Sequence, residues 1–108
     1  MGVFDVRFSA AADEDLGRLL GFLLDSAKTV EDRHEAELAI SAISAISAAV
    51  FSYLAHTPYS FRKAGRGSTR RELIIPFGTT GYVALFEILD LTFVLVLAVR
   101  HQRGADYH

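Results

Sequence analysis

The sequence predicts an α+β domain in which a helical hairpin packs against a twisted, mainly antiparallel sheet. Two stretches of helical periodicity fill residues 10–55, and three short apolar segments follow in residues 72–99. Only a few residues separate these three segments, which is typical of antiparallel neighbours. With one strand before the helices the order is β-α-α-β-β-β, and this segregation of strands and helices favours α+β over α/β.

The first element is a short strand over residues 3–8, where V-F-D-V-R-F alternates apolar and charged side chains. A period of two gives a strand one buried and one solvated face. Ser9 follows as a natural helix N-cap, and the three acids of residues 10–15 suit the positive end of a helix dipole. The sequence therefore predicts a helix from Ala10 to about residues 27–29, with its apolar side formed by Leu16, Leu19, Leu20, Leu23 and Leu24.

A second helix is predicted from about residues 29–32 to Ala55, because acids cluster in its first turns. Small residues at Ala42, Ala45 and Ala48 would allow another element to approach closely. We expect its buried stripe to comprise Ile40, Ile43, Ile46 or Ser47, Val50, and Tyr53 or Leu54.

Pro58 ends the second helix, since the residue before a proline avoids the helical region. Residues 59–70 contain two Gly and no acid and are predicted to form a loop. Pro76 indicates an edge position or a bulge in the strand that follows. The three last strands are predicted at residues 72–77, 82–89 and 93–99, with turns at 78–81 and 90–92.

The composition is that of one globular domain spanning residues 1–108, with 51% hydrophobic and 22% charged residues. The absence of Cys excludes disulfides and thiolate chemistry. The first residues lack the pattern of a signal peptide. The longest uninterrupted apolar run, Phe93 to Val99, is far below the ~20 residues of a membrane span. We therefore expect a cytoplasmic protein that does not enter a membrane.

Charge is divided unevenly along the chain. Residues 1–57 contain four Lys or Arg and nine acids, hence −5, whereas residues 58–108 contain seven and four, hence +3. A basic second half within a protein of net charge −2 predicts a local surface for an anionic partner. It does not predict a protein that coats nucleic acid nonspecifically.

The C-terminal part resembles a known family. R-R-E-L-I-I-P-F-G-T-T-G-Y-V-A-L-F-E-I (residues 70–88) and V-L-A-V-R-H-Q-R-G-A-D-Y-H (residues 96–108) are similar to RelE/ParE toxins, in the branch named for plasmid stabilisation. The resemblance implies a growth-inhibiting toxin of a type II toxin–antitoxin system, without cofactor. It also implies a cognate antitoxin that binds through an acidic C-terminal segment and forms a hetero-oligomer with the toxin.

The family contains two activities on one fold, so the fold does not choose between them. RelE-like members are ribosome-dependent mRNA endoribonucleases, and ParE-like members inhibit DNA gyrase. The resemblance places His101 and Tyr107 at the spacing of an Arg and a Tyr in a RelE-like site, flanked by Arg100 and Arg103 as phosphate ligands. RelE-like nucleases, however, place an Arg just after a Gly-Tyr pair, and Val83 stands there. Loss of a cation aimed at a scissile phosphate costs orders of magnitude in rate.

The remaining candidate residues are basic or acidic side chains of the second half. A phosphate or an antitoxin carboxylate is expected to bind among Arg62, Lys63, Arg66, Arg70, Arg71, Arg100 and Arg103. Glu87 is expected to form a structural ion pair, with Arg71 or Arg100 as its partner. The four His are scattered, so no metal site is expected.

These observations favour a ParE-like inhibitor of DNA gyrase that acts as a binder and not as an enzyme. One alternative is a RelE-like endoribonuclease that uses His101, Tyr107 and the two flanking arginines. Another is an inactive family member that is retained for antitoxin binding.

Overall fold

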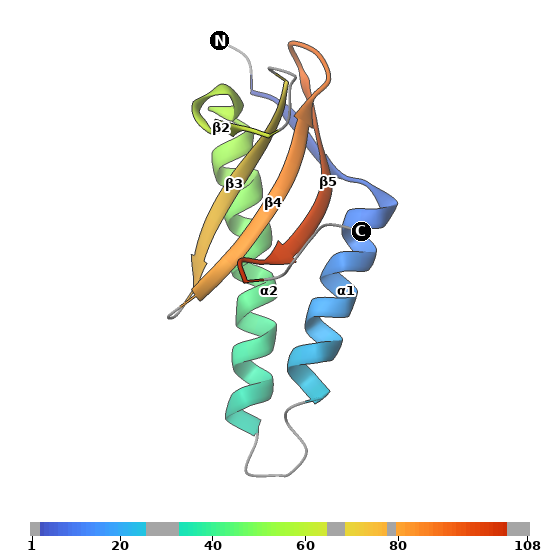
Figure 1. The fold of residues 1–108 in the computed structure, drawn as a ribbon, viewed down its shortest axis with the longest axis vertical. Helices are drawn as coiled ribbons and strands as arrows, with labels where there is room; N and C mark the ends of the chain where they lie inside the picture. Colours follow the sequence, from blue (N-terminus) through green and yellow to red (C-terminus); the bar gives the residue numbers. More distant parts are fainter. Residues whose placement is uncertain (1–2, 26–32, 65–68, 78–79, 104–108) are drawn as a thin grey trace.

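The computed structural model describes residues 3–25, 33–64, 69–77 and 80–103, which form two layers (Figure 1). One layer is a five-stranded sheet, and the other is a pair of helices that covers one face of it. The elements are β1 (Asp5–Phe8), α1 (Ala10–Asp25), α2 (Arg33–Leu54), the 3-10 helix η2 (Pro58–Ser60), β2 (Arg62–Lys63), β3 (Arg70–Phe77), β4 (Thr80–Ile88) and β5 (Phe93–His101). The predicted α+β class and helical hairpin are confirmed.

The sheet has the strand order β1-β5-β4-β3-β2. β1 runs parallel to β5, and the other neighbouring strands are antiparallel. The parallel pair joins residues 5–8 to residues 93–96, so the two ends of the described chain lie side by side in one sheet. The connection between them contains both helices and the strands β2, β3 and β4, and a parallel neighbour requires such a long connection.

The predicted loop at residues 59–70 was wrong in part. Pro58–Ser60 form one 3-10 turn, and Arg62–Lys63 form the short strand β2 against Arg71 and Glu72 of β3. A two-residue strand has too few positions for alternation to be recognised, and its stability depends on its partner strand. The predicted end of the first helix, the start of the second and part of the 78–81 turn lie outside the described residues.

The pairing of β4 with β5 contains a β-bulge, which lies in β5. Leu85 pairs with Ala98 and Phe86 pairs with Val96, so Leu97 is an extra residue between them. The extra residue reverses the alternation of side chains along β5. Val96 and Val99 therefore both reach the core, although they are an odd number of positions apart.

Pro76 lies on an open edge of the sheet, as predicted. Beyond Glu72, β3 has no strand partner on the side away from β4 in the described part of the chain. The N–H of Ala64 donates to the carbonyl of Arg70 at 2.8 Å. Backbone groups alternate in direction along a strand, so those of Ile74 and Pro76 also point to this edge. The missing N–H of Pro76 therefore costs the sheet no hydrogen bond.

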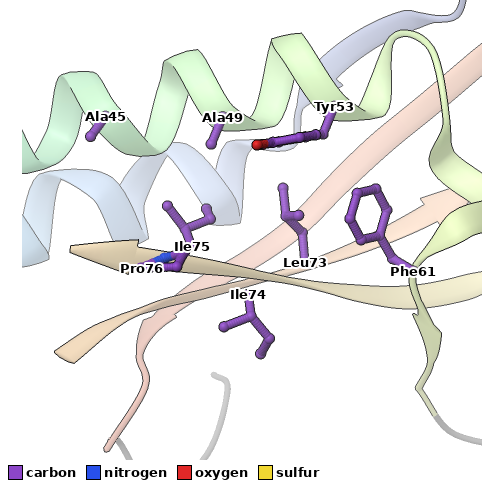
Figure 2. A pocket seen from close by; sticks show the side chains of 8 residues that line it. All are labelled: Ala45, Ala49, Tyr53, Phe61, Leu73, Ile74, Ile75 and Pro76. Atoms are coloured by element: carbon purple, nitrogen blue, oxygen red, sulfur yellow. The ribbon is translucent and has the colours of Figure 1, made fainter.

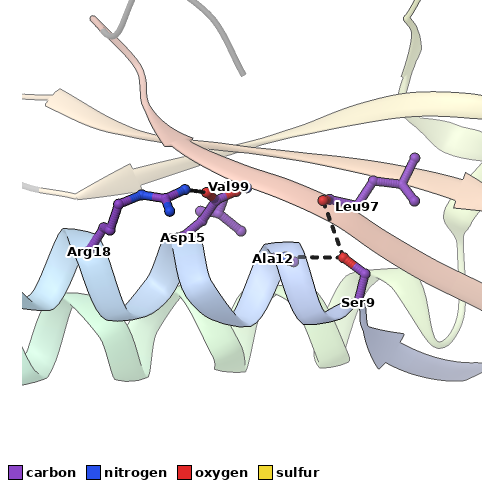
Figure 3. A network of polar contacts seen from close by, with 6 residues as sticks. All are labelled: Ser9, Ala12, Asp15, Arg18, Leu97 and Val99. Carbon is purple, nitrogen blue, oxygen red and sulfur yellow. Dashed lines mark hydrogen bonds and ion pairs between the residues drawn. The ribbon is translucent and has the colours of Figure 1, made fainter. Parts of the chain in front are cut away.

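Polar groups of α1 attach it to β5 where β1 has ended (Figure 3). Ser9 caps the helix as predicted, because its Oγ accepts the N–H of Ala12 at 3.0 Å. The Ser9 N–H donates to the carbonyl of Val96 at 2.9 Å. Two turns into the helix, the carboxylate of Asp15 accepts the N–H of Val99 at 2.9 Å and also pairs with Arg18. The helix thus provides hydrogen-bond partners that a neighbouring strand would otherwise supply.

The core lies between the two layers. A stripe of α2 at spacings of three or four residues packs on the sheet, and its buried members are Ala39, Ala42, Ile46, Val50 and Leu54. The predicted stripe was right for Ile46, Val50 and Leu54 and wrong for Ile40 and Tyr53, which are 57% and 53% exposed. Ala42 had been predicted as a place of close approach, and its burial confirms this, whereas Ala39 was overlooked because bulk was used as the sign of burial. Their size lets the helix approach the strands closely.

Residues Glu37–Leu54 have a mean hydropathy of 1.6, which by length and composition alone would suit a membrane-crossing helix. The same stretch contains the core stripe of α2, and core helices share this property. Its polar residues there are small serines and one acid, which interrupt the apolar run without lowering the average greatly.

Candidate functional site

A groove of about 420 Å³ runs between α2 and the open edge of β3 (Figure 2). Figure 2 shows Leu73 and Ile75 pointing toward α2, while Ile74 points to the opposite side of the strand. The small side chains of Ala45 and Ala49 form the helical wall. Tyr53 and Phe61 lie together at one end, with ring centroids 6.0 Å apart.

This groove combines two means of binding a peptide. Its walls are apolar, so side chains inserted there leave water. Its rim is the edge of β3, where the backbone groups of Ile74 can pair with an added strand. Ala45 had been recognised in the sequence as a place of close approach, whereas no sequence pattern indicated Tyr53 or Phe61 as groove residues.

Two of the basic candidate residues already have acidic partners on the sheet. Arg62 pairs with Glu72 at 2.9 Å, and Arg70 pairs with Glu87 at 2.8 Å. The expected ion pair of Glu87 therefore exists, but its partner is Arg70 and not Arg71 or Arg100. Arg70 lies directly opposite Glu87 in the register of β3 and β4, so the two side chains project from the same face.

Arg71 lies on the other face and fastens the segment before β2. Its Nη1 donates to the carbonyl of Phe61 at 2.7 Å and to that of Tyr59 at 3.2 Å. The guanidinium carbon lies 5.4 Å from the centre of the Tyr59 ring. Arg71 thus holds η2 and β2 against β3, a role that sequence analysis did not assign to it.

The remaining basic candidates of this region are Lys63 and Arg66. Lys63 is exposed on β2 and has no ion pair with any residue that the structure describes. Arg66 lies outside the described residues. Lys63 follows Phe61 by two positions, so it stands near the aromatic end of the groove.

The C-terminal candidate residues do not form one cluster. Arg100 lies opposite Val83 and His101 lies opposite Tyr82, so their side chains project from opposite faces of the sheet. Arg100 donates from Nη1 to the carbonyls of His101 and Gln102, each at 3.2 Å. Arg103 is in the turn that follows, and Tyr107 lies outside the described residues.

His101 belongs to an aromatic row on the helix-covered face. Its ring centroid is 5.5 Å from that of Tyr82, which is 6.4 Å from that of Phe77. The His101 Nδ1 accepts the N–H of Arg103 at 3.1 Å and so closes the turn after β5. Burial raises the pKa of the Tyr82 phenol above its ordinary value, because the phenolate would lose hydration.

The family model that describes the ParE toxin of the type II toxin–antitoxin system parDE matches residues 6–105. A comparison with the sequences of curated proteins gave no match.

Two solved structures share the fold. A chain of the chromosomal ParDE system from P. aeruginosa superposes with a TM-score of 0.67 at 14% identity, covering 92% of this chain and 96% of that one. A chain of the RelBE2 toxin–antitoxin complex from Mycobacterium tuberculosis superposes with a TM-score of 0.59 at 20% identity, covering 96% and 97%. Because the family match spans nearly all of the sequence, the chain belongs to the ParE toxins of type II toxin–antitoxin systems, within the RelE/ParE superfamily.

Proposed function

We propose that this protein inhibits bacterial growth as a ParE-like inhibitor of DNA gyrase and that a cognate antitoxin neutralises it. In this role the toxin is a binder, and gyrase performs the chemistry. The observation that supports this choice is the separation of Arg100 and His101 onto opposite faces of the sheet. A nuclease needs a general base and a phosphate-binding cation around one scissile bond.

Two further features of the C-terminal region support a binder. Val83 follows Gly81-Tyr82, at the position where RelE-like nucleases have an arginine. The guanidinium of Arg100 already donates to two backbone carbonyls of its own strand end. These bonds engage Nη1 and hold the guanidinium against the strand end.

The proposed antitoxin site is the groove between α2 and β3. An extended antitoxin segment would pair with the open edge at Ile74 and place apolar side chains against Ala45 and Ala49. Lys63 stands near the aromatic end without an acidic partner among the described residues, so an acidic antitoxin residue suits that end. The toxin, the antitoxin and gyrase would meet in the cytoplasm.

Expression in a bacterium, with and without the antitoxin encoded by a neighbouring gene, tests the proposal. The toxin alone should stop growth, and the pair should not. Purified toxin should inhibit gyrase supercoiling while transcripts on translating ribosomes stay intact. Normal growth at high expression would contradict the proposed toxicity and would favour the alternative of an inactive, antitoxin-binding protein. Transcript cuts that vanish in His101→Ala would establish the endoribonuclease instead.

The groove has its own test. Ala49→Trp should fill it and abolish binding of the antitoxin, measured by calorimetry with the purified partner. Ser52→Trp places the same bulk at an exposed position of α2 and serves as the matched control. Equal antitoxin affinity of the two variants would show that the segment binds elsewhere.

A further inference from the structure

Both helices lie on one side of the sheet and leave its other face uncovered (Figure 1). The strand registers place four larger apolar side chains there, beside the almost fully buried Val83 and Ala98, in rows that alternate with the core residues. All four are half-buried, and none packs against the core cluster. The apolar centre consists of Ile74, Leu85, Phe93 and Leu95.

Ion pairs surround this apolar centre. On β1, Arg7 pairs with Asp5 at 3.2 Å, and the pairs Arg62–Glu72 and Arg70–Glu87 lie on the same face. Arg100, also on this face, donates to backbone carbonyls. Every arginine of this face that the structure describes is therefore already engaged by an acceptor of the chain itself.

This pattern does not suit a nucleic acid. A polyanion binds through cations that neutralise its phosphates and release counterions, and here acids accompany the cations. An apolar centre with a polar and charged rim is instead the arrangement found in protein–protein interfaces, where charges are depleted from the centre and arginines are enriched. The pairing of the rim charges leaves a nearly neutral surface, which is complementary to an apolar prominence on a protein.

We propose that the target enzyme of the toxin docks on the uncovered face through Ile74, Leu85, Phe93 and Leu95. This inference rests on the proposed function, because it takes the target to be a protein. It adjoins the antitoxin groove between α2 and β3 only at Ile74, whose backbone lies at the groove rim while its side chain points away from α2. The antitoxin would then neutralise the toxin without occupying the centre of the target-binding face.

The change Leu95→Lys separates protein docking from nucleic-acid binding. Leu95 lies between Arg7 and Glu87 in the sheet, so the new ammonium has a carboxylate beside it and the strand keeps its neighbours. A charge in an apolar contact would weaken docking, and we expect gyrase inhibition to fall at least ~10-fold. An RNA-binding face would instead gain a cation and bind more tightly.

Leu91→Lys is the matched control, since Leu91 is 84% exposed in the turn between β4 and β5 and lies outside the apolar centre. It should inhibit gyrase as the unchanged protein does. Both variants are first checked by thermal unfolding and by antitoxin binding. Should Leu95→Lys fail to fold, the neutral change Leu95→Gln replaces it, with the same expected direction and a smaller loss.

A labelling experiment reads docking without activity. The chain contains no Cys, so Leu95→Cys introduces a unique thiol. Purified gyrase should slow its alkylation by a maleimide at least ~10-fold, and should leave the thiol of Leu91→Cys unaffected. A structured RNA at the same concentration should protect neither.

The outcomes separate the two proposals. An unchanged protein that does not inhibit gyrase overturns the proposed function, and this inference with it. Inhibition by the unchanged protein together with equal inhibition by Leu95→Lys overturns the inference alone. Protection of the Leu95→Cys thiol by RNA and not by gyrase overturns it as well.

Discussion

The attachment of α1 to β5 leads to a prediction of stability. Asp15 is 5% exposed, and its carboxylate accepts the Val99 N–H at 2.9 Å at a point where none of the described strands covers that side of β5. Asp15→Ala removes the acceptor and leaves a buried N–H without a partner. We expect the folded state to lose stability and α1 to separate from β5 more easily.

The magnitude follows from the two contributions involved. A hydrogen bond to a charged group is worth ~1.5–3 kcal/mol, and leaving its donor unsatisfied costs ~1–3 kcal/mol. The two figures partly describe the same loss, so they are not added in full. We therefore expect Asp15→Ala to lower the free energy of unfolding by about 3 kcal/mol. For a domain of about 100 residues this corresponds to a fall in Tm of roughly 12 °C or more.

Urea unfolding followed by circular dichroism measures the change, and hydrogen exchange at the Val99 amide reports on it locally. Asp15→Asn keeps an oxygen that can accept the same N–H and loses only the charge, so it should cost about 1 kcal/mol. Glu14→Ala removes an exposed acid from the neighbouring position of the same helix and is the control. If Asp15→Ala cost no more than Glu14→Ala, or left exchange at Val99 unchanged, the assignment of this contact would be refuted.

Three more predictions follow from the fold. Arg71→Lys keeps the charge but loses the guanidinium that donates to two carbonyls, so the segment before β2 should be held less firmly. Trypsin should then cut after Lys63 faster than in the unchanged protein, and the free energy of unfolding should fall by about 1 kcal/mol. An unchanged cutting rate would contradict the role of Arg71. Gly81→Ala would push a Cβ into the backbone oxygen of Ile75 and should destabilise by about 2 kcal/mol or more. Gly17→Ala, with open space around its Cβ in α1, should stabilise by ~0.5–1 kcal/mol. Equal effects of the two changes in urea unfolding would refute the close approach at Gly81. Burial raises the pKa of Tyr82, so its contribution to stability is complete below the ordinary phenol pKa of 10.0 and is lost as pH rises from there through the pKa of the folded state. Tyr82→Phe should abolish this part of the loss of stability at alkaline pH. An absorbance titration in which every tyrosine ionises at its ordinary pH would contradict the raised pKa of Tyr82.

The repeating patterns of the sequence predicted the layers of the fold well. Alternation at residues 3–8 and the cap at Ser9 led to β1 and the start of α1, and Pro76 indicated the open edge. Such features are local, because they depend on the residue types of a few neighbouring positions. The family match confirmed the toxin family that residues 70–108 had indicated.

The relations between distant residues could not be predicted in the same way. Asp15 looked like one of several helix-start acids, and only the position of β5 makes it a partner of Val99. Arg70, Arg71 and Glu87 were recognised as charged, but their pairing depends on register, and a shift of one residue exchanges the two faces. The bulge at Leu97 has this effect within β5, so alternation alone would misplace Val99.

The same dependence on side-chain direction explains why the sequence suggested that Arg100 and His101 form one site and the structure separates them. The string Val-Arg-His at residues 99–101 suggested a cation and an acid–base group side by side. In a strand, neighbours in sequence project to opposite sides, and the structure separates Arg100 from His101 in this way. Residues close in sequence share one face of a strand, and so can form one site, only when they are two positions apart.

The pairing of β1 with β5 has a consequence for the time at which the toxin becomes active. β1 is made first and its only neighbour among the described strands is made last, so the sheet remains incomplete while the chain is still being translated. Contacts between the chain ends also form late because closing a long loop is costly. A prematurely terminated chain would lack β5, and with it the strand that β1, α1 and β4 all contact. We expect unfinished toxin to be harmless and open to proteolysis, so that a cell needs its antitoxin only once the final strand has left the ribosome.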